Sequence, residues 1–396
     1  MKRESNMLPV MWNKSGKKCD MSISTFTKER TSEHHIMITP RGINNFYEQY
    51  QVLKEALLSF ILERGKKNCH LIFQRIFFSD ITNQSEIISE VDMLKDNGIE
   101  STISWIQQPP LNHVKCTLYA YLIETEDFIK IDHTLTPKHI ELEKGSYSHL
   151  WSGRLISSES GDSYAQTEEI FHHYDLLLKE KAYDFAEMCH RTWLYVRDVD
   201  TNYQGVVEAR NAYFDTIGLI PSNHFVTSTG IEGRDLDVKK NVVMDAYAVK
   251  GLQKEQVRYI SALSHLNPTH EYGVRFERGT AIDFGDRRHI YISGTASIDN
   301  KGEIVHPNHI ILQADRAMEN ISALLKEEEA NTDNIMQMII YLRDVADYEI
   351  IEKYYNERYP NTPKVIVLAP VCRPGWLIEI ECIAIKSVNI PAYPNF

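Results

Sequence analysis

The chain has 396 residues, enough for two or three domains, and its composition, 43% hydrophobic and 25% charged, is ordinary for a globular protein. A formal net charge of -12 weighs against a nucleic-acid binder, because such proteins normally present a basic face. We find neither an apolar run long enough to span a membrane nor the apolar core of a signal peptide. The six cysteines form no CxxC pair and show no zinc-ligand spacing, so we expect reduced thiols in a cytoplasmic protein and no metal.

The first predicted unit begins with a helix, because Phe46, Tyr50, Leu53, Leu57 and Phe60 recur at helical spacing and Gly65 is a plausible end. A strand, IFQRIFFSDITN (72–83), follows and ends in a turn at Asp80. A second helix is predicted in QSEIISEVDML (84–94), and a closing strand in KCTLYAYLI (115–123).

The same order of elements recurs twice along the chain. The second unit has helix 165–182, strand 189–201 with Asp198, helix 203–218 and strand 241–249. The third has helix 311–326, strand 336–347 with Asp344, helix 347–360 and strand 376–385. Before the first helix, WSGRLI (151–156) is similar to ISGTASI (292–298), whereas the first unit offers only IMITPRG (36–42). The sequence therefore predicts three copies of one strand, strand, helix, strand, helix, strand unit.

This pattern predicts an α+β fold in which each sheet is covered by helices on one face. The predicted boundaries are a 1–29 N-terminal extension, a degenerate first repeat at 30–125, a second repeat at 146–250, a connecting insertion at 251–287 and a third repeat at 288–388. The alternative is that three unrelated α+β domains look alike by chance.

The third unit resembles the RidA/YjgF family through SGTASIDNKGEIV, QADRAMENI, YLRDVADYEIIEKYYNERYP and IEIECIAI. Members of that family have a chorismate-mutase-like α/β sandwich fold and form homotrimers with ligand clefts between subunits. The resemblance implies that the three repeats form a pseudo-trimer within a single, monomeric chain.

A second resemblance covers roughly residues 145 to 390. TWLYVRDV, EARNAYF, TSTGIEG, HEYGVRFERG, ISGTASI and VCRPGWLIEIE together, and in this order, are similar to the chorismatase family. Those enzymes cleave chorismate into pyruvate and either a hydroxybenzoate or a dihydroxy-diene carboxylate. The resemblance implies a cofactor-free lyase or hydrolase that binds a small carboxylate substrate, with no nucleic-acid or membrane partner.

Strand alternation places Glu379 and Glu381 on one face of the last strand, away from the face that suits the helices. The aligned positions are Val243 and Asp245 in the second unit and, in the first, about Leu118 or Tyr119. Only the third unit carries an acid at the 379 position, and the family's catalytic glutamate falls on Glu379. We expect a general acid whose pKa is raised by burial or by a like charge. The alternative is a solvated glutamate on an exposed sheet face.

Chorismate carries two carboxylates, so a chorismatase site needs cations, and arginine binds carboxylates with two hydrogen bonds. The candidate substrate-binding residues come from the segments that carry the resemblance: Arg210, Tyr213, Tyr272, Arg278, Gly294, Thr295, Ala296, Cys372 and Arg373. In the chorismatase family, a cysteine at the position of Cys372 accompanies formation of 3-hydroxybenzoate. Alternatively, each arginine is an ordinary surface side chain, and the cysteine is a small apolar residue that fills space in the core.

Two other functions stay open. The chain is alternatively an imine or enamine deaminase of the RidA kind, or a non-catalytic protein that binds a metabolite. In the deaminases an arginine one strand before the glutamate holds the substrate carboxylate, and that position falls on Lys364. Lysine keeps the charge but lacks the planar fork of arginine, which weighs against deamination. The HExxH, GxGxxG, P-loop and GxSxG motifs are absent, so no metal or cofactor is predicted.

Overall fold

Three six-stranded sheets with the same strand order make up the computed structural model, which describes residues 10–15, 18–85 and 94–396. The orders are β1-β2-β3-β6-β4-β5, β7-β8-β9-β12-β10-β11 and β13-β14-β15-β18-β16-β17. In each sheet the last pair of this order is parallel and the other pairs are antiparallel. We call the sheets with their helices the first, second and third repeat.

The strands of the first repeat are β1 (Val10–Ser15), β2 (Cys19–Lys28), β3 (Thr31–Pro40), β4 (Cys69–Phe78), β5 (Thr102–Gln107) and β6 (Cys116–Thr125). Those of the second are β7 (Ile129–Asp132), β8 (His139–Lys144), β9 (Tyr147–Ile156), β10 (Cys189–Val196), β11 (Thr227–Glu232) and β12 (Val242–Lys250). Those of the third are β13 (Val257–Ile260), β14 (Gly279–Asp283), β15 (Arg287–Ala296), β16 (Ile335–Leu342), β17 (Lys364–Leu368) and β18 (Ile378–Ser387).

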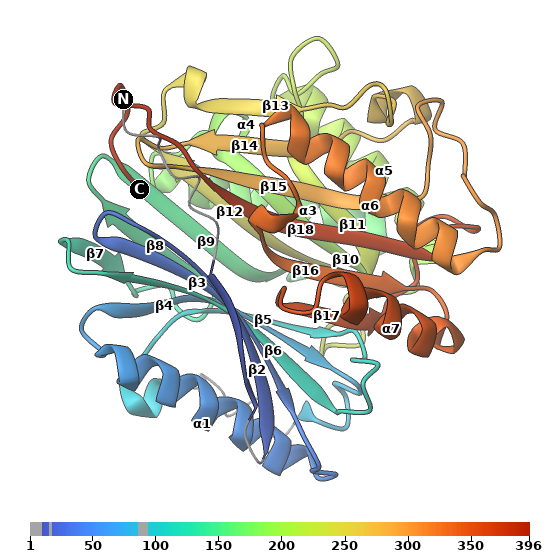
Figure 1. The fold of residues 1–396 in the computed structure, drawn as a ribbon. Helices are drawn as coiled ribbons and strands as arrows, with labels where there is room; N and C mark the ends of the chain where they lie inside the picture. Colours follow the sequence, from blue (N-terminus) through green and yellow to red (C-terminus); the bar gives the residue numbers. More distant parts are fainter. Residues whose placement is uncertain (1–9, 16–17, 86–93) are drawn as a thin grey trace.

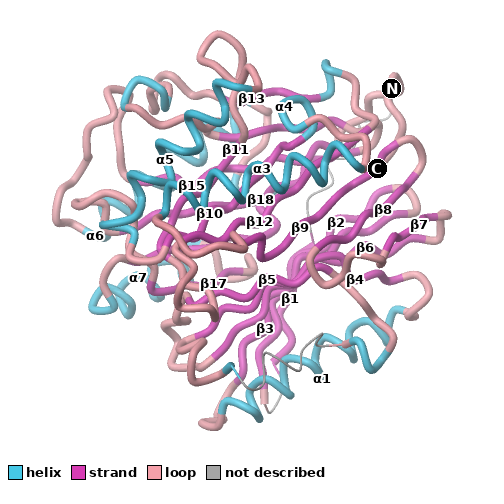
Figure 2. The backbone as a smooth tube through the Cα atoms, turned by 180° about the vertical axis from the view of Figure 1, so that it is seen from behind, coloured by secondary structure: helices cyan, strands magenta, loops and turns pink. Residues whose placement is uncertain are grey.

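The helices cover the outer faces of the sheets. In the described residues they are α1 (Phe46–Arg64) on the first sheet, α3 (Ser163–Glu180), α4 (Phe185–Met188) and α5 (Val199–Thr216) on the second, and α6 (Ile310–Glu327) and α7 (Tyr348–Arg358) on the third. Figure 1 shows α1 beneath the first sheet and α6 against the third, and Figure 2 shows α3 and α5 on the second. None of the described helices is long and apolar enough to cross a membrane.

The structure confirms the predicted fold class and enlarges the predicted unit from four strands to six. Segment 251–287, expected to be a connecting insertion, instead contributes β13 and β14 to the third sheet. In the first repeat, β1 and β2 both come from the predicted N-terminal extension 1–29. The short strands were missed because their apolar runs are brief and irregular. The helix predicted over 84–94 lies largely at 86–93, outside the described residues.

The inner faces of the three sheets meet in one shared core. Aromatic rings link the repeats: Phe73 contacts Trp151 at 5.2 Å between ring centroids, and Tyr247 contacts Tyr291 at 5.5 Å. Separate apolar clusters lie between the first sheet and α1 and between the second sheet and its helices. Each sheet is therefore buried on both faces, which explains why its central strands are so rich in apolar residues.

Strand pairing fixes which residues are equivalent in the three repeats. Phe77, Tyr195 and Tyr341 each lie three positions before the turn aspartates Asp80, Asp198 and Asp344. Their antiparallel partners are Thr117, Val243 and Glu379. The first-repeat equivalent of Glu379 is therefore Thr117, not Leu118 or Tyr119 as the sequence alignment suggested. Among these three positions only the third holds an acid, as predicted.

Candidate active site

A small cavity, with a volume of about 30 Å³, lies at the junction of the second and third repeats. The second repeat contributes residues from α5 and β11, and the third contributes β15, β18 and the loops before β14 and β18. The lining residues are Tyr203, Arg210, Ser228, Gly230, Tyr272, Val274, Phe276, Arg278, Gly294, Ala296, Ile298, Cys372, Arg373, Trp376 and Glu379.

Glu379 reaches the cavity because the neighbouring strand bulges opposite it. The pairing of β15 with β18 shifts between Ile292 and Thr295, and Gly294 lies in this shift. A Cβ atom on Gly294 would overlap the Glu379 carboxyl oxygen Oε1, so only glycine leaves room for the acid there. Gly294 N–H donates to the Thr229 hydroxyl at 2.9 Å, which fixes the bulge to the second repeat.

The Glu379 carboxyl is held in its protonated form near neutral pH. Its side chain is buried, and no hydrogen bond or ion pair reaches it from the residues that the structure describes. Burial raises its pKa to about 8, the charge of Glu381 adds to the rise, and Arg278 and Arg191 oppose it. A carboxyl with such a pKa is mostly protonated at pH 7 and can donate a proton.

Arg210 enters the cavity from α5 without a carboxylate partner. Its side chain is 1% exposed, and its Nε and Nη2 atoms have no hydrogen-bond acceptor in the described structure. Burial lowers the pKa of this guanidinium, and the opposing groups are Tyr203, Cys372 and Tyr272, none of them a carboxylate. Tyr203 lies two helical turns before Arg210 and shares its face of α5. A buried, unpaired guanidinium is costly for the empty protein and calls for an anionic ligand.

Two more arginines, both from the third repeat, line the cavity. Arg278 donates from Nη2 to the backbone oxygen of Asn267 at 3.1 Å, and its buried Nε has no acceptor among the described residues. Arg373 lies over the Tyr272 ring at 4.6 Å and the Trp376 ring at 5.4 Å. Besides the Glu379 carboxyl, the buried lining atoms without a partner among the described residues are donors: Arg210 Nε and Nη2, Arg278 Nε and Trp376 Nε1. These donors suit a ligand rich in negatively charged oxygen.

Cys372 lies between the acid and the second repeat. Burial, with a contribution from the Glu379 charge, raises the pKa of its thiol to about 12, and the thiol interacts with the Tyr203 hydroxyl. At neutral pH it is a neutral thiol and not a nucleophilic thiolate.

The structure brings together eight of the ten predicted site residues: Glu379, Arg210, Tyr272, Arg278, Gly294, Ala296, Cys372 and Arg373. Tyr213 does not line the cavity. It lies one helical turn beyond Arg210 on α5, and its ring is 5.3 Å from those of Phe171 on α3 and Phe185 on α4. Thr295 does not line the cavity either: it is buried beside it and donates to the Ser293 backbone oxygen at 2.9 Å.

Sequence reasoning missed Tyr203, Ser228, Gly230, Val274, Phe276 and Ile298 and did not assign Trp376 to binding. Tyr203 was detectable, because it precedes Arg210 by seven residues on a predicted helix. Gly230 was not: a Cβ there would lie 2.8 Å from the Tyr203 ring, a contact between elements that the sequence does not pair.

Lys364 does not line this cavity. It begins β17 and donates from Nζ to the Tyr359 backbone oxygen at 2.9 Å. By register, Lys364 pairs with Met338 as Ser228 pairs with Thr192, so Ser228 is its counterpart in the second repeat. Ser228 is the residue that lines the cavity. The position that carries an arginine in imine deaminases is therefore a serine at this junction.

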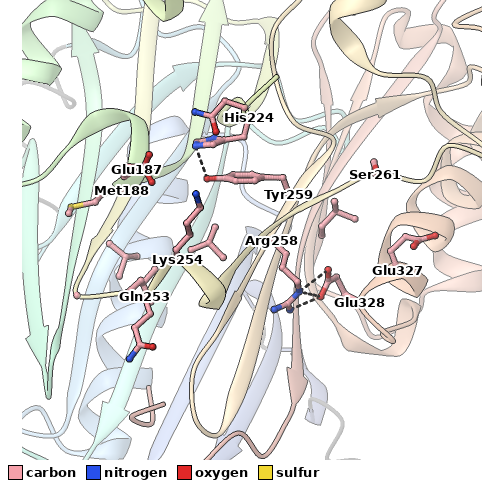
Figure 3. Close-up of a pocket in the computed structure, with 16 residues that line it drawn as sticks. Glu187, Met188, His224, Gln253, Lys254, Arg258, Tyr259, Ser261, Glu327 and Glu328 are labelled. Carbon is pink, nitrogen blue, oxygen red and sulfur yellow. Dashed lines mark hydrogen bonds and ion pairs between the residues drawn. The ribbon is translucent and has the colours of Figure 1, made fainter. Parts of the chain in front are cut away.

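A second hollow lies between the same two repeats but does not include Glu379 (Figure 3). Arg258 pairs there with Glu328 and with Asp283, at 2.7 Å and 2.8 Å. His224 stacks on Tyr259 with ring centroids 4.0 Å apart. Arg258 already has two carboxylate partners, so this hollow does not present an arginine without an ion pair as the cavity does with Arg210. Among the described residues no three His, Cys, Asp or Glu side chains are grouped to hold a metal ion.

The third repeat also matches known proteins. The profile of the family described as Endoribonuclease L-PSP matches residues 279–386. A RutC family protein of Saccharolobus solfataricus is 33% identical over 100 residues, which cover 25% of this chain and 79% of that protein. The 3-aminoacrylate deaminase RutC of Acinetobacter baylyi is 29% identical over 97 residues, which cover 24% of this chain and 77% of that enzyme.

A solved structure matches most of the chain. A chorismatase crystal structure superposes with a TM-score of 0.59 over 80% of this chain and 93% of the other, at 16% sequence identity. This likeness shows the fold, a set of three repeats around one core, and at this identity it extends no further. The sequence match to the Saccharolobus protein, which covers most of that protein's length, identifies the chain as a member of the RutC family.

Proposed function

We propose that the cavity between the second and third repeats cleaves chorismate to pyruvate and either a dihydroxy-diene carboxylate or a hydroxybenzoate, with Glu379 as the general acid. The observation that carries the proposal is a buried carboxyl with a pKa of about 8 in a cavity whose other charged groups are three arginines. A proton donor surrounded by cations suits a substrate that carries carboxylates and reacts by protonation.

The reaction begins when Glu379 donates its proton to the terminal methylene carbon of the enolpyruvyl ether. The electron pair of the double bond forms the new C–H bond, and the carbon attached to the ether oxygen becomes an oxocarbenium centre. Water adds there, and the resulting hemiketal collapses, which breaks the bond between that carbon and the ether oxygen. Pyruvate and the ring alcohol leave, and the proton released from water restores Glu379. Attack by the neighbouring ring hydroxyl in place of water leads to the hydroxybenzoate branch.

The arginines match the two carboxylates of chorismate. Arg210 belongs to the second repeat, and Arg278 and Arg373 belong to the third. We assign one carboxylate to Arg210 and the other to the Arg278 and Arg373 pair. The cavity is narrow, so a six-membered ring is admitted only when lining side chains move. Arg373, which stacks on Tyr272 and Trp376 without an acid partner, is the one we expect to move.

The first test is pyruvate release from chorismate by the purified chain and by Glu379→Gln. Loss of a general acid typically lowers the rate about 10²–10⁴-fold, so we expect at least a hundredfold decrease with the fold unchanged by circular dichroism. Glu357→Gln makes the same change at an exposed position of the third repeat and should release pyruvate at the wild-type rate. Chromatography of the aromatic or diene product assigns the branch.

The alternative is deamination of small imines or enamines, which the name of the Acinetobacter relative suggests. Ser228 at the position of the carboxylate-binding arginine weighs against it. Ammonia release from 2-aminoacrylate, together with no pyruvate release from chorismate, would overturn the proposal in favour of deamination. A folded chain that binds chorismate without releasing pyruvate would instead indicate a binding protein.

A further inference from the structure

We propose that Glu381 is a positioning residue that keeps the proton on Glu379, and that the first and second repeats supply the cations that hold Glu381 as a carboxylate. The proposal deepens the proposed function and rests on Glu379 being the proton donor. It assigns a task in the reaction to the first repeat, whose own equivalent of Glu379 is Thr117.

The two glutamates differ in their surroundings although they share one face of β18. Glu381 is 1% exposed and has three partners. Arg191 Nη2 donates to its Oε2 at 2.7 Å, Trp193 Nε1 donates to its Oε1 at 2.8 Å, and Arg75 Nη1 lies 3.7 Å from Oε1. Glu379 has none of these. These donors stabilise a negative charge on Glu381 and none of them donates to Glu379, so Glu379 is the carboxyl of the two on which a proton is favoured.

Arg75 connects this carboxylate to all three repeats. It lies on β4 of the first repeat and is 1% exposed. Its Nη2 and Nε atoms donate to Asp245 Oδ2 of the second repeat at 2.9 Å and 3.2 Å. Two arginines and two aspartate or glutamate carboxylates thus balance one another in the shared core, which leaves Glu379 as the acid without a counter-ion.

Asp245 and Glu381 occupy equivalent positions in their repeats, because Asp245 pairs with Trp193 as Glu381 pairs with Ile339. Asp245 is two residues from Val243, whereas Glu381 is two residues from Glu379. The same carboxylate position is therefore present in two repeats, and in only one of them does it stand next to an acid. This pair provides a matched comparison within one molecule.

The other titratable groups near the two glutamates come from several elements of all three repeats. Glu381 interacts with Tyr341 on β16, Tyr195 and Arg191 on β10, Arg75 on β4, Tyr119 on β6 and Cys382 on β18. Glu379 faces Glu381, Arg278, Arg191, Tyr341, Tyr203 and Cys372. Burial raises the pKa of each of these tyrosines and of the Cys372 thiol, so near neutral pH Glu379 is the group that exchanges a proton here.

The test is a direct titration of Glu379 that needs no substrate. Infrared difference spectra of wild type against Glu379→Gln identify the carbonyl stretch of the protonated Glu379 carboxyl, and its intensity is followed with pH. In Glu381→Gln the midpoint should move to lower pH by about one unit or more, because a neighbouring negative charge is lost. In Asp245→Asn, the matched change, it should move by less than half of that shift. Glu381→Asp keeps the charge and should keep the midpoint.

An unchanged midpoint in Glu381→Gln, or equal shifts in Glu381→Gln and Asp245→Asn, would overturn the proposal. Should Glu381→Gln not fold, the double variant Arg191→Gln/Glu381→Gln keeps the charge balance. It should shift the midpoint in the same direction, since Glu381 acts on Glu379 more strongly than Arg191 does. If the midpoint moves as expected while wild type releases no pyruvate from chorismate, the proposed reaction fails and the role of Glu381 stands. If both hold, the alkaline limb of kcat/KM moves with the midpoint.

Discussion

Gly294 and Glu379 face each other across the bulge between β15 and β18, and a methyl group on residue 294 would overlap the Glu379 Oε1 atom. We therefore expect Gly294→Ala to displace the acid and to lower pyruvate release at least tenfold, with little change in secondary structure. The measurement is kcat for chorismate together with the far-ultraviolet circular dichroism spectrum.

A control for this change lies in the second repeat. Gly153 occupies the equivalent bulge of β9, where a Cβ would lie 2.8 Å from the Ile103 backbone oxygen. Gly153→Ala should lower the free energy of unfolding but leave kcat per folded molecule unchanged. Equal losses of kcat in the two variants would show that the glycine at 294 serves packing alone.

Replacing Arg210 should raise the stability of the empty protein and weaken substrate binding. Arg210→Met removes a buried charge that has no carboxylate partner, so the empty protein should gain stability, by about 1 kcal/mol or more. The KM for chorismate should rise about 10–100-fold, because a hydrogen bond to a charged group is worth about 1.5–3 kcal/mol. Urea unfolding and initial rates measure the two effects. Arg358→Met, at a half-exposed arginine of α7, should change neither; an unchanged KM in Arg210→Met would exclude Arg210 from the binding site.

Glu379 also predicts how stability depends on pH. Its pKa in the folded protein, about 8, is above the ordinary value of 4.5, so between these values the folded state binds more protons than the unfolded state. The contribution of this group is fully present below about pH 4.5 and is lost as the pH rises through about 8, at a slope of up to about 1.4 kcal/mol per pH unit. The difference in unfolding free energy between wild type and Glu379→Gln, measured by urea unfolding from pH 5 to 9, should show this slope. A pH-independent difference would contradict the raised pKa.

Arg75 and Asp245 predict coupling between the first and second repeats. Arg75→Met leaves Asp245 without its ion pair, and Asp245→Leu does the same to Arg75, so each should cost about 3–5 kcal/mol. The double variant should cost clearly less than the sum of the two, since it leaves neither charge unpaired. Denaturant unfolding of the four proteins completes the cycle. Additive losses would mean that the ion pair contributes no coupling.

Cys372 predicts an effect on the product and not on the proton transfer. Its thiol has a pKa of about 12 and stays neutral during catalysis. Cys372→Ala should therefore keep pyruvate release within about tenfold of wild type, far less than the loss expected for a general acid. By the resemblance to chorismatases, the ratio of hydroxybenzoate to dihydroxy-diene product should change, as chromatography can measure. A loss of pyruvate release as large as that of Glu379→Gln would instead place the thiol in the protonation step.

The fold could be predicted because each repeat shows the same order of apolar strand and helix patterns in its own sequence. The strand that ends at Asp344 and the helix that follows it repeat the order found at Asp198, and β-branched and aromatic runs separate strands from helices without reference to the rest of the chain. β13 was missed because it has only four residues in an irregular stretch and is fixed by pairing with β14. Such strands are determined by tertiary contacts and not by local preference.

The site was predictable to the extent that its residues follow an alternating strand or a similar segment. The strand period placed Glu379 on the face that lines the cavity, and its segment pointed to Arg210, which lines it too. Tyr213 does not line the cavity, because one turn beyond Arg210 its ring packs against Phe171 and Phe185 instead. The partners of Glu381 could not be predicted, since Arg75 and Arg191 are joined to it only when strands from three repeats meet.

The equivalent positions Thr117, Val243 and Glu379 have a consequence for how such a molecule can change. In an assembly of identical subunits every substitution is made three times, so an unfavourable buried acid would be carried in every cleft. Here the three repeats belong to one chain, so the cost of the buried acid arises at one junction only. The equivalent positions of the other two repeats hold Thr117 and Val243, which carry no charge and pack without that cost. Each junction can therefore change on its own. A substitution at Val243 or Thr117 affects the packing of its own junction and leaves the position of Glu379 unchanged.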